Sequence, residues 1–289
     1  MQITDVLGPR GRQRVAVGSV ISVLIFAALM VAAVRRLQAK GQFEPELWRG
    51  FAARTIGSNG RLYPIARFLL SGLWSTLRVT IVALAITIVV GVAMALVRLS
   101  RRRATRSLGT VYVQLFRGLP LLLLIYFAEK VLPGWGKALG WDWLASLDRG
   151  WLLGRAPTRG GWFVVLGLSL YYSAVVSEII RTGVNSLPSG QHEAAAAIGL
   201  THWQGLRLVL LPQAIRRMTP DLLSQSITLF KDSSFGLAVA YEDLLRRGQI
   251  NGEFLSNPLQ SLFVVAVVYI IVSAMLSTAV ARIQRKGSR

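Results

Sequence analysis

Long apolar runs recur along the chain at the length that an α-helix needs to cross a membrane, which is about 20 residues. Three of these runs contain no charged residue, and they cover 15–34, 79–97 and 259–281. Three weaker runs contain charged residues or a proline, and they cover 111–127, 162–180 and 221–240. The helix of the second run is expected to begin near Gly72. The pattern predicts an all-α integral membrane protein with about six transmembrane helices.

The first apolar run has two interpretations. It follows Arg10, Arg12 and Arg14, as the apolar part of a cleaved signal peptide would. However, 15–34 is longer than the usual apolar part of a signal peptide, and the basic pair Arg35-Arg36 follows it directly. We therefore expect a retained transmembrane helix.

The chain is strongly basic, with 33 Lys and Arg against 13 Asp and Glu and a net charge of +20. Such a charge could indicate a nucleic-acid partner, but the basic residues mostly flank the apolar runs. That position is typical of anchors at the membrane interface and of contacts with anionic lipid. We therefore expect membrane lipid, and no nucleic acid, as a partner.

The distribution of basic residues also predicts the orientation in the membrane. The short link after the second run is rich in arginine, and both ends of the chain are basic. Placing all three in the cytoplasm gives cytoplasmic tails at 1–14 and 283–289. It also puts 35–71 outside, although that segment carries seven Lys and Arg. An outer aromatic belt is expected from the tryptophans of 134–161, which are Trp135, Trp141, Trp143 and Trp151.

A polar segment, 191–212, stands out among the apolar runs. It opens with an alanine-rich stretch that favours a helix, and Gly199 follows where a glycine would end that helix. Thr201 and Gln204 have the spacing of a capping box, which starts a second helix. Leu211-Pro212 is expected to interrupt this second helix. A pair of short helices between membrane spans suggests a surface that a partner grips.

This segment resembles the EAA loop of the permease subunits of bacterial ABC importers. The matching residues are Glu193, Ala194, Ala195, Gly199, Leu211 and Pro212, with the spacing of that motif. In that family the loop is a coupling helix, which docks into a cleft on a separate ATPase subunit. The resemblance therefore implies that these six residues contact an ATPase.

Four more segments resemble the branch of the family that imports polar amino acids. The first two are GLWSTLRVT at 72–80 and FRGLP at 116–120, in which Leu119 stands where threonine is usual. The others are SEIIRTGVNSLPSGQ from residue 177 and LFKDSS at 229–234, followed by YEDLL at 241–245. This resemblance covers about 72–289. It implies the type I ABC importer permease fold, with a five-helix core at 72–282 and an added helix at 15–34. The extra helix and the loop after it are most similar to glutamate-type permeases.

The resemblance implies a transporter subunit in a bacterial inner membrane, with both termini cytoplasmic. Expected partners are two ATPase subunits, a second permease of the same or a paralogous kind, and a solute-binding protein outside. ATP and Mg²⁺ would bind the ATPase and not this chain. The sequence agrees, because it contains no G-x-x-x-x-G-K-[ST] phosphate-binding loop. Transport would proceed by alternating access, with glutamate as the first candidate substrate.

Charged residues inside the expected spans are candidates for the substrate pathway, because each costs several kcal/mol in a bilayer. Those residues, with one neighbouring serine, are Arg117, Glu178, Lys231, Asp232 and Ser233. Lys231 and Asp232 lie mid-span in this interpretation, and neighbours on a helix point about 100° apart. Each therefore needs a partner on another helix, a broken helix end or a watery cavity. A purely structural role remains open for all five.

Two other function classes remain as alternatives. An ion-coupled secondary transporter or a channel would use the same polar residues for an ion, but it would leave the EAA spacing unexplained. A membrane enzyme would need a catalytic cluster, and none is visible. The two histidines, His192 and His202, lack a third ligand at metal spacing, so we expect no metal site.

Overall fold

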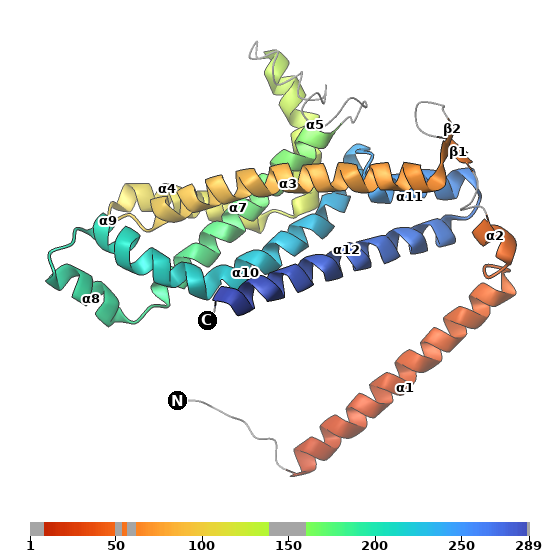
Figure 1. Cartoon of the computed structure of the whole chain (residues 1–289), viewed down its shortest axis with the longest axis horizontal. Helices are drawn as coiled ribbons and strands as arrows, with labels where there is room; N and C mark the ends of the chain where they lie inside the picture. The colour runs from red at the N-terminus through yellow and green to blue at the C-terminus, as the bar shows by residue number, and fades with distance from the viewer. Residues whose placement is uncertain (1–8, 50–53, 57–61, 139–159, 288–289) are drawn as a thin grey trace. The chain divides into compact units, whose positions relative to one another are not determined.

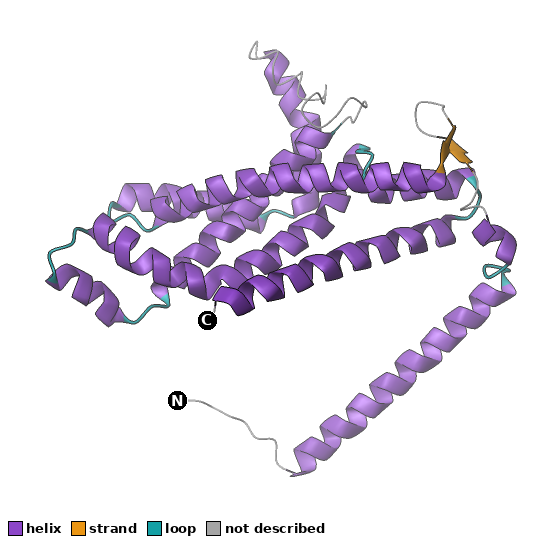
Figure 2. Ribbon diagram, in the orientation of Figure 1, coloured by secondary structure: helices purple, strands orange, loops and turns teal. Residues whose placement is uncertain are grey.

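The computed structural model describes residues 9–49, 54–56, 62–138 and 160–287 (Figure 1). The chain divides into two compact units, Met1–Ala53 and Arg54–Arg289. Most described residues are helical, and one short antiparallel hairpin joins the helices (Figure 2). The tryptophans at 141, 143 and 151 lie outside the described residues, so the expected aromatic belt is described only at Trp135, which is exposed in α5.

The first unit consists of α1 (Pro9–Ala39) and the short α2 (Pro45–Arg49). The apolar side chains along 15–34 are exposed, and the stretch Val15–Ala39 is long and apolar enough to cross a membrane. A helix that is apolar on all sides suits a lipid environment, because it has no polar face to turn toward water. The predicted span at 15–34 is therefore part of a longer helix.

The second unit opens with a hairpin of β1 (Arg54–Ile56) and β2 (Leu62–Pro64), which leads into α3 (Ile65–Arg98). The expected start of this helix near Gly72 is wrong by seven residues. Pro64 is the N-cap of α3, and a proline at a helix start loses no intrahelical hydrogen bond. α3 packs along α7 (Gly161–Asn185), and the two backbones approach closely at Gly91. A Cβ there would lie 2.7 Å from Val176 Cγ1.

The single span expected at 111–127 is instead two helices. These are α4 (Arg103–Gly118) and α5 (Leu121–Ala138), which meet at an angle of 99°. Leu119 has an extended backbone between them. The ring of Pro120 causes this, because a proline disfavours the helical conformation in the residue before it. The pair forms a bent span or a re-entrant loop.

The segment after α7 stays helical for longer than expected. It contains α8 (Ser189–Ala197), α9 (His202–Gly205), a π-helical turn η3 (Leu206–Leu210) and α10 (Leu211–Asp232). The expected interruption at Leu211-Pro212 is wrong. Pro212 stands in the first turn of α10, where its missing N–H costs nothing, and the π-helical turn before it keeps the chain helical.

The span expected at 221–240 is also misplaced. α10 ends at Asp232, and the chain tightens into a 3₁₀ helix, η4 (Ser233–Val239), which Ala240 ends with a φ of 53°. Two adjacent serines explain the change, because serine hydroxyls compete for backbone hydrogen bonds and disfavour the α-helix. Lys231 and Asp232 therefore lie at a helix end and not in mid-span. The chain continues through α11 (Leu244–Phe254) into α12 (Pro258–Gly287).

Four described helices are long and apolar enough to cross a membrane: α1, α3, α7 and α12. The bent pair α4–α5 makes a fifth candidate, and α10 has the length of a sixth but is more polar. α10 and α12 lie side by side and run in opposite directions (Figure 1). In the second unit the C-termini of α3 and α7 and the start of α10 share one end, which we call the α8 end. The start of α3 and α11 share the opposite end, the α11 end.

Two apolar clusters hold the second unit together. One lies among α3, α5 and α7 and includes Val79, Ile125 and Leu168, which are almost fully buried. The other lies at the α8 end and includes Val184, Leu206 and Ala214. Since each buried aliphatic side chain stabilises the fold by about 1.5–3 kcal/mol, the second cluster fixes η3 and α10 firmly against α7.

Candidate functional site

The turn between α8 and α9 is built by local hydrogen bonds that the sequence anticipates. Gly199 has a φ of 81° and donates to Ala196 O, while Leu200 N donates to Ala195 O at 3.1 Å. This pair of bonds is the Schellman motif, which ends a helix at a left-handed residue. Thr201 and Gln204 then form the predicted capping box. The two short helices are therefore joined in a defined geometry.

The EAA residues divide between an exposed and a buried face. Glu193 and Ala194 are exposed, whereas Ala195 is buried against Gly205. Large apolar side chains are also exposed along this segment: Ile198, Trp203 and Leu208. Exposed apolar groups of this size beside polar residues are typical of a protein–protein contact surface. Leu211 and Pro212 lie farther along, at the start of α10.

This segment is attached to the membrane helices at several points. His202 Nε2 lies 2.9 Å from Leu99 O at the end of α3. Gln213 Nε2 donates to Gln191 Oε1 at 2.9 Å, which joins α10 to α8. Leu206 is buried in the second apolar cluster. These contacts join α8 and α9 to α3 and α10.

Two of the predicted pathway residues, Glu178 and Arg117, meet at the α8 end. Glu178 of α7 binds Arg98 of α3 at 2.5 Å and Arg181 at 2.6 Å. Arg117 of α4 is more distant, with 3.9 Å between its Nη1 and Glu178 Oε2. Arg98 is only 8% exposed, so its charge depends on this carboxylate for compensation. The cluster joins three helices.

The other three predicted residues lie at the junction of α10 and η4, and their side chains have different surroundings. Lys231 is exposed and lines a cavity of about 580 Å³. Asp232 is half-buried and accepts a hydrogen bond from Tyr172 of α7 at 2.6 Å. Ser233 is buried and donates to Phe230 O at 2.8 Å. Of the three, only Lys231 faces open space.

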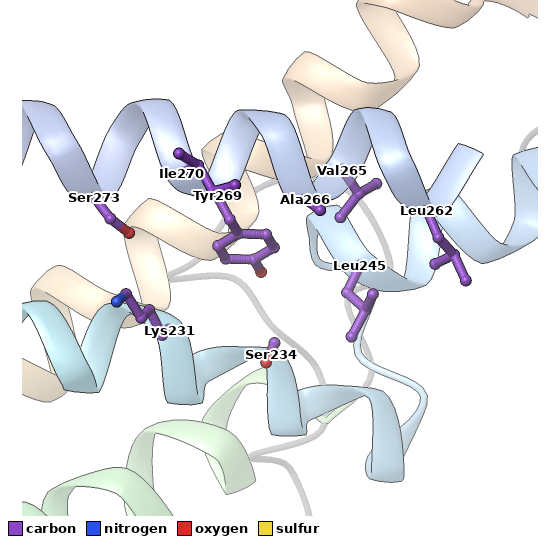
Figure 3. Close-up of a pocket in the computed structure, with 9 residues that line it drawn as sticks. All are labelled: Lys231, Ser234, Leu245, Leu262, Val265, Ala266, Tyr269, Ile270 and Ser273. Atoms are coloured by element: carbon purple, nitrogen blue, oxygen red, sulfur yellow. The ribbon is translucent and has the colours of Figure 1, made fainter. Parts of the chain in front are cut away.

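The cavity beside Lys231 lies between the α10–η4 junction and α12. Lys231 and Ser234 stand on one side, and Tyr269 of α12 faces them across it (Figure 3). The remaining lining is mostly aliphatic, with the polar Ser273 at one end. An apolar chamber of this size with one cation and a few hydroxyls suits a small anionic solute.

The α11 end contains a second set of buried polar groups. Asp243 caps α11 by accepting from Arg246 N at 2.8 Å, and burial raises the pKa of its carboxyl to about 7. Leu244 N donates to Thr76 Oγ1, and Arg247 binds Glu242 at 3.4 Å. The bond between Leu244 and Thr76 holds α11 against α3, while the other two contacts fix the first turns of α11 itself.

The described residues contain no group of three or more His, Cys, Asp or Glu that could hold a metal ion. The expectation that this chain binds no metal or cofactor stays a prediction.

The sequence reasoning missed three residues that complete these sites. Arg98 directly follows the second apolar run, where a basic residue is expected as an interface anchor, yet it is the nearest partner of Glu178. Tyr172 and Tyr269 are the other two, and each carries a hydroxyl inside a long apolar run. That hydroxyl is the available signal, because a tyrosine buried in a membrane helix needs a hydrogen-bond partner.

Residues 87–289 match the family of binding-protein-dependent transport system inner membrane components. The chain is 32% identical to the glutamate transport system permease protein GluD of Corynebacterium glutamicum, over 86% of this chain and 83% of that protein. It is also 32% identical to the glutamate/aspartate import permease protein GltK of Escherichia coli O6:H1, over 78% of this chain and 96% of that protein.

Solved structures of transporters have the same fold. An amino acid ABC transporter solved with histidines matches with a TM-score of 0.63 and 26% identity, over 76% of this chain and 94% of that chain. The methionine ABC transporter MetNI, in an inward-facing form, matches with a TM-score of 0.62 and 21% identity, over 78% and 99%. The predicted membrane permease fold is thus confirmed. The chain belongs to the family of binding-protein-dependent transport system inner membrane components.

Proposed function

We propose that this chain is the permease subunit of an ATP-driven importer of polar amino acids, with glutamate as the first candidate substrate. The names of the two relatives above, a glutamate permease and a glutamate/aspartate permease, support this substrate. Another relative, the arginine transport system permease protein ArtQ of Bacillus subtilis, is 30% identical, so the family branch extends to other polar amino acids.

The observation that carries the proposal is the path of α10. This helix starts at Leu211, beside the α8–α9 segment, and ends at Asp232, beside the Lys231 cavity. At about 1.5 Å per residue, its 22 residues extend over about 33 Å. A helix of this length connects a partner contact at the α8 end to a solute chamber deeper in the protein, which is what ATP-driven gating requires.

In this proposal, a separate ATPase grips the exposed face of α8 and α9 through Glu193, Ala194 and the apolar side chains beside them. Two ATPase subunits carry ATP and Mg²⁺, and a second permease, identical or paralogous, completes the transmembrane pathway. ATP binding brings the coupling segments together and turns the chamber outward, and hydrolysis restores the inward state. A solute-binding protein delivers the amino acid from outside.

Within the pathway, Lys231 contacts the carboxylate of the solute, because it is the exposed cation of the chamber. Asp232 and Ser233 hold the helix end in place for Lys231 through Tyr172 and the backbone. Glu178 and Arg117 form the inner end of the pathway, where their ion pairs change as α4 and α7 move. Each of these roles rests on the contacts described above.

Reconstitution tests the proposal directly. The chain is purified with candidate ATPases, placed in proteoliposomes, and supplied with labelled glutamate and a candidate binding protein. We expect uptake that requires ATP on the side of the membrane where the ATPase is bound. A catalytically inactive ATPase serves as the control. Uptake driven by an ion gradient without ATP would contradict the proposal and would indicate a secondary transporter.

A further inference from the structure

A second cavity, of about 530 Å³, lies at the α8 end and has a strongly basic lining. It is bounded by the end of α3, the turn into α4, the end of α7 and α9. Four arginines line it: Arg98, Arg101, Arg106 and Arg181. The proposed transport cycle uses neither this cavity nor its two outer arginines, Arg101 and Arg106.

The cavity has positive charge that the chain does not neutralise. Arg98 and Arg181 share the carboxylate of Glu178. Arg101 and Arg106 are exposed and form no ion pair with any residue that the structure describes. Four guanidinium groups therefore face one carboxylate, and like charges held this close favour a bound anion.

The start of α4 adds to the attraction. This 16-residue helix begins at Arg103, its N-cap Arg102 makes no side-chain capping bond, and no acidic residue occupies its first turn. The N-terminus of a helix carries a partial positive charge, which favours an anion nearby. Guanidinium groups match the geometry of phosphate oxygens and bind them bidentately.

The surroundings of the cavity indicate a lipid as the source of the phosphate. α3 and α7 are both long and apolar enough to cross the bilayer, and the cavity lies where both end, which is the depth of lipid headgroups. Leu99, Val184 and Leu206 give it an apolar side next to the arginines. A phospholipid has the same order of groups, with a phosphate beside glycerol and hydrocarbon.

We propose that this cavity binds the phosphate of an anionic phospholipid in the leaflet that surrounds the α8 end, with Arg101 and Arg106 as its principal ligands. The bound headgroup lies beside the contact between His202 and Leu99 O, which joins α9 to α3. It therefore stabilises the joint between the coupling segment and the membrane helices. The binding itself does not depend on which solute is transported.

Native mass spectrometry of the full-length chain tests the proposal. Protein purified in mild detergent is titrated with phosphatidylglycerol and, separately, with phosphatidylcholine. The variant Arg101→Gln/Arg106→Gln is compared with Arg102→Gln/Arg103→Gln, which also removes two positive charges from this segment, but from residues outside the cavity lining. Both variants weaken the positive-inside signal equally, so effects on insertion are matched.

We expect the wild type and the Arg102→Gln/Arg103→Gln control to retain phosphatidylglycerol in preference to phosphatidylcholine. The Arg101→Gln/Arg106→Gln variant should bind phosphatidylglycerol at least about tenfold more weakly, since it removes two charge-assisted hydrogen bonds to the phosphate. Equal loss in both double variants would overturn the proposal, because it would show diffuse attraction. Retention by Arg101→Gln/Arg106→Gln at the wild-type level would also overturn it.

A competition arm separates lipid from free phosphate. Inorganic phosphate in the millimolar range is added before the lipid titration, and the melting temperature of the detergent-solubilised chain is recorded. A lipid site predicts that phosphate neither displaces phosphatidylglycerol nor raises the melting temperature. Stabilisation by phosphate alone, with no retained lipid, would contradict the lipid assignment and assign the cavity to a soluble anion.

Discussion

At the scale of single residues, Lys231 and Asp232 show how adjacent charges take different roles at a helix end. Asp232 turns toward α7 and accepts from Tyr172, while Lys231 faces the cavity. The sequence predicted that the two would not pair with each other, because adjacent helical residues point in different directions. It could not predict their partners, since Tyr172 lies 60 residues away.

The Lys231→Ala substitution tests the role of this cation. We expect the KM for glutamate uptake to rise about tenfold or more, because a charge-assisted hydrogen bond to a carboxylate contributes about 1.5–3 kcal/mol. The amount of assembled protein should not change, since Lys231 is exposed. The measurement is initial-rate uptake into proteoliposomes. Lys231→Arg is the matched control, and it should keep most of the affinity because it keeps the positive charge. An unchanged KM in Lys231→Ala would show that the role of Lys231 is structural.

At the scale of elements, helix ends that are set by residues within one turn were predictable, whereas helix angles and continuations that depend on more distant residues were not. Gly199, Thr201 and Gln204 form the predicted turn because a helix cap depends on residues within one turn. The effect of Pro212 was predicted wrongly because a proline breaks a helix in its interior but is tolerated in its first turn. The π-helical turn that ends at Leu210 places Pro212 in the first turn of α10. Pro120 gave a visible signal of distortion, but not the 99° angle.

The turn after α8 yields a prediction about coupling. Gly199→Val should lose most ATP-driven uptake while the protein still inserts into the membrane. A β-branched residue at a φ of 81° costs about 1–2 kcal/mol or more, so the α8–α9 angle changes. The space around Gly199 is open, and the effect is therefore conformational and not steric.

Gly190→Ala is the matched control for Gly199→Val. Gly190 lies in the first turn of α8, with equally open surroundings and without a positive φ, so alanine there should be tolerated. ATP-dependent uptake and copurification of the ATPase are measured for both variants. Wild-type uptake by Gly199→Val would show that the left-handed turn does not set the coupling geometry.

At the scale of the whole molecule, the sequence predicted the family and the membrane permease fold, but not how distant helices are joined. The contact between Arg98 and Glu178 connects residues 80 positions apart, and no local pattern in one sequence reports such a pair. The EAA spacing was informative because all six of its residues lie within 20 positions of one another. Their relation to the Lys231 cavity became visible only with α10 in place.

The orientation of the chain in the membrane is testable with single cysteines, because the natural sequence contains none. Ser189→Cys places a thiol at the start of α8, and Glu253→Cys places one near the end of α11, and both positions are exposed. If both termini and the α8 end face the cytoplasm, a membrane-impermeant maleimide should label Glu253→Cys in intact spheroplasts. Ser189→Cys should react only after the membrane is permeabilised. The opposite labelling pattern would show that the orientation is inverted. α8 would then lie beyond the reach of a cytoplasmic ATPase, and the coupling proposal would lose its physical basis.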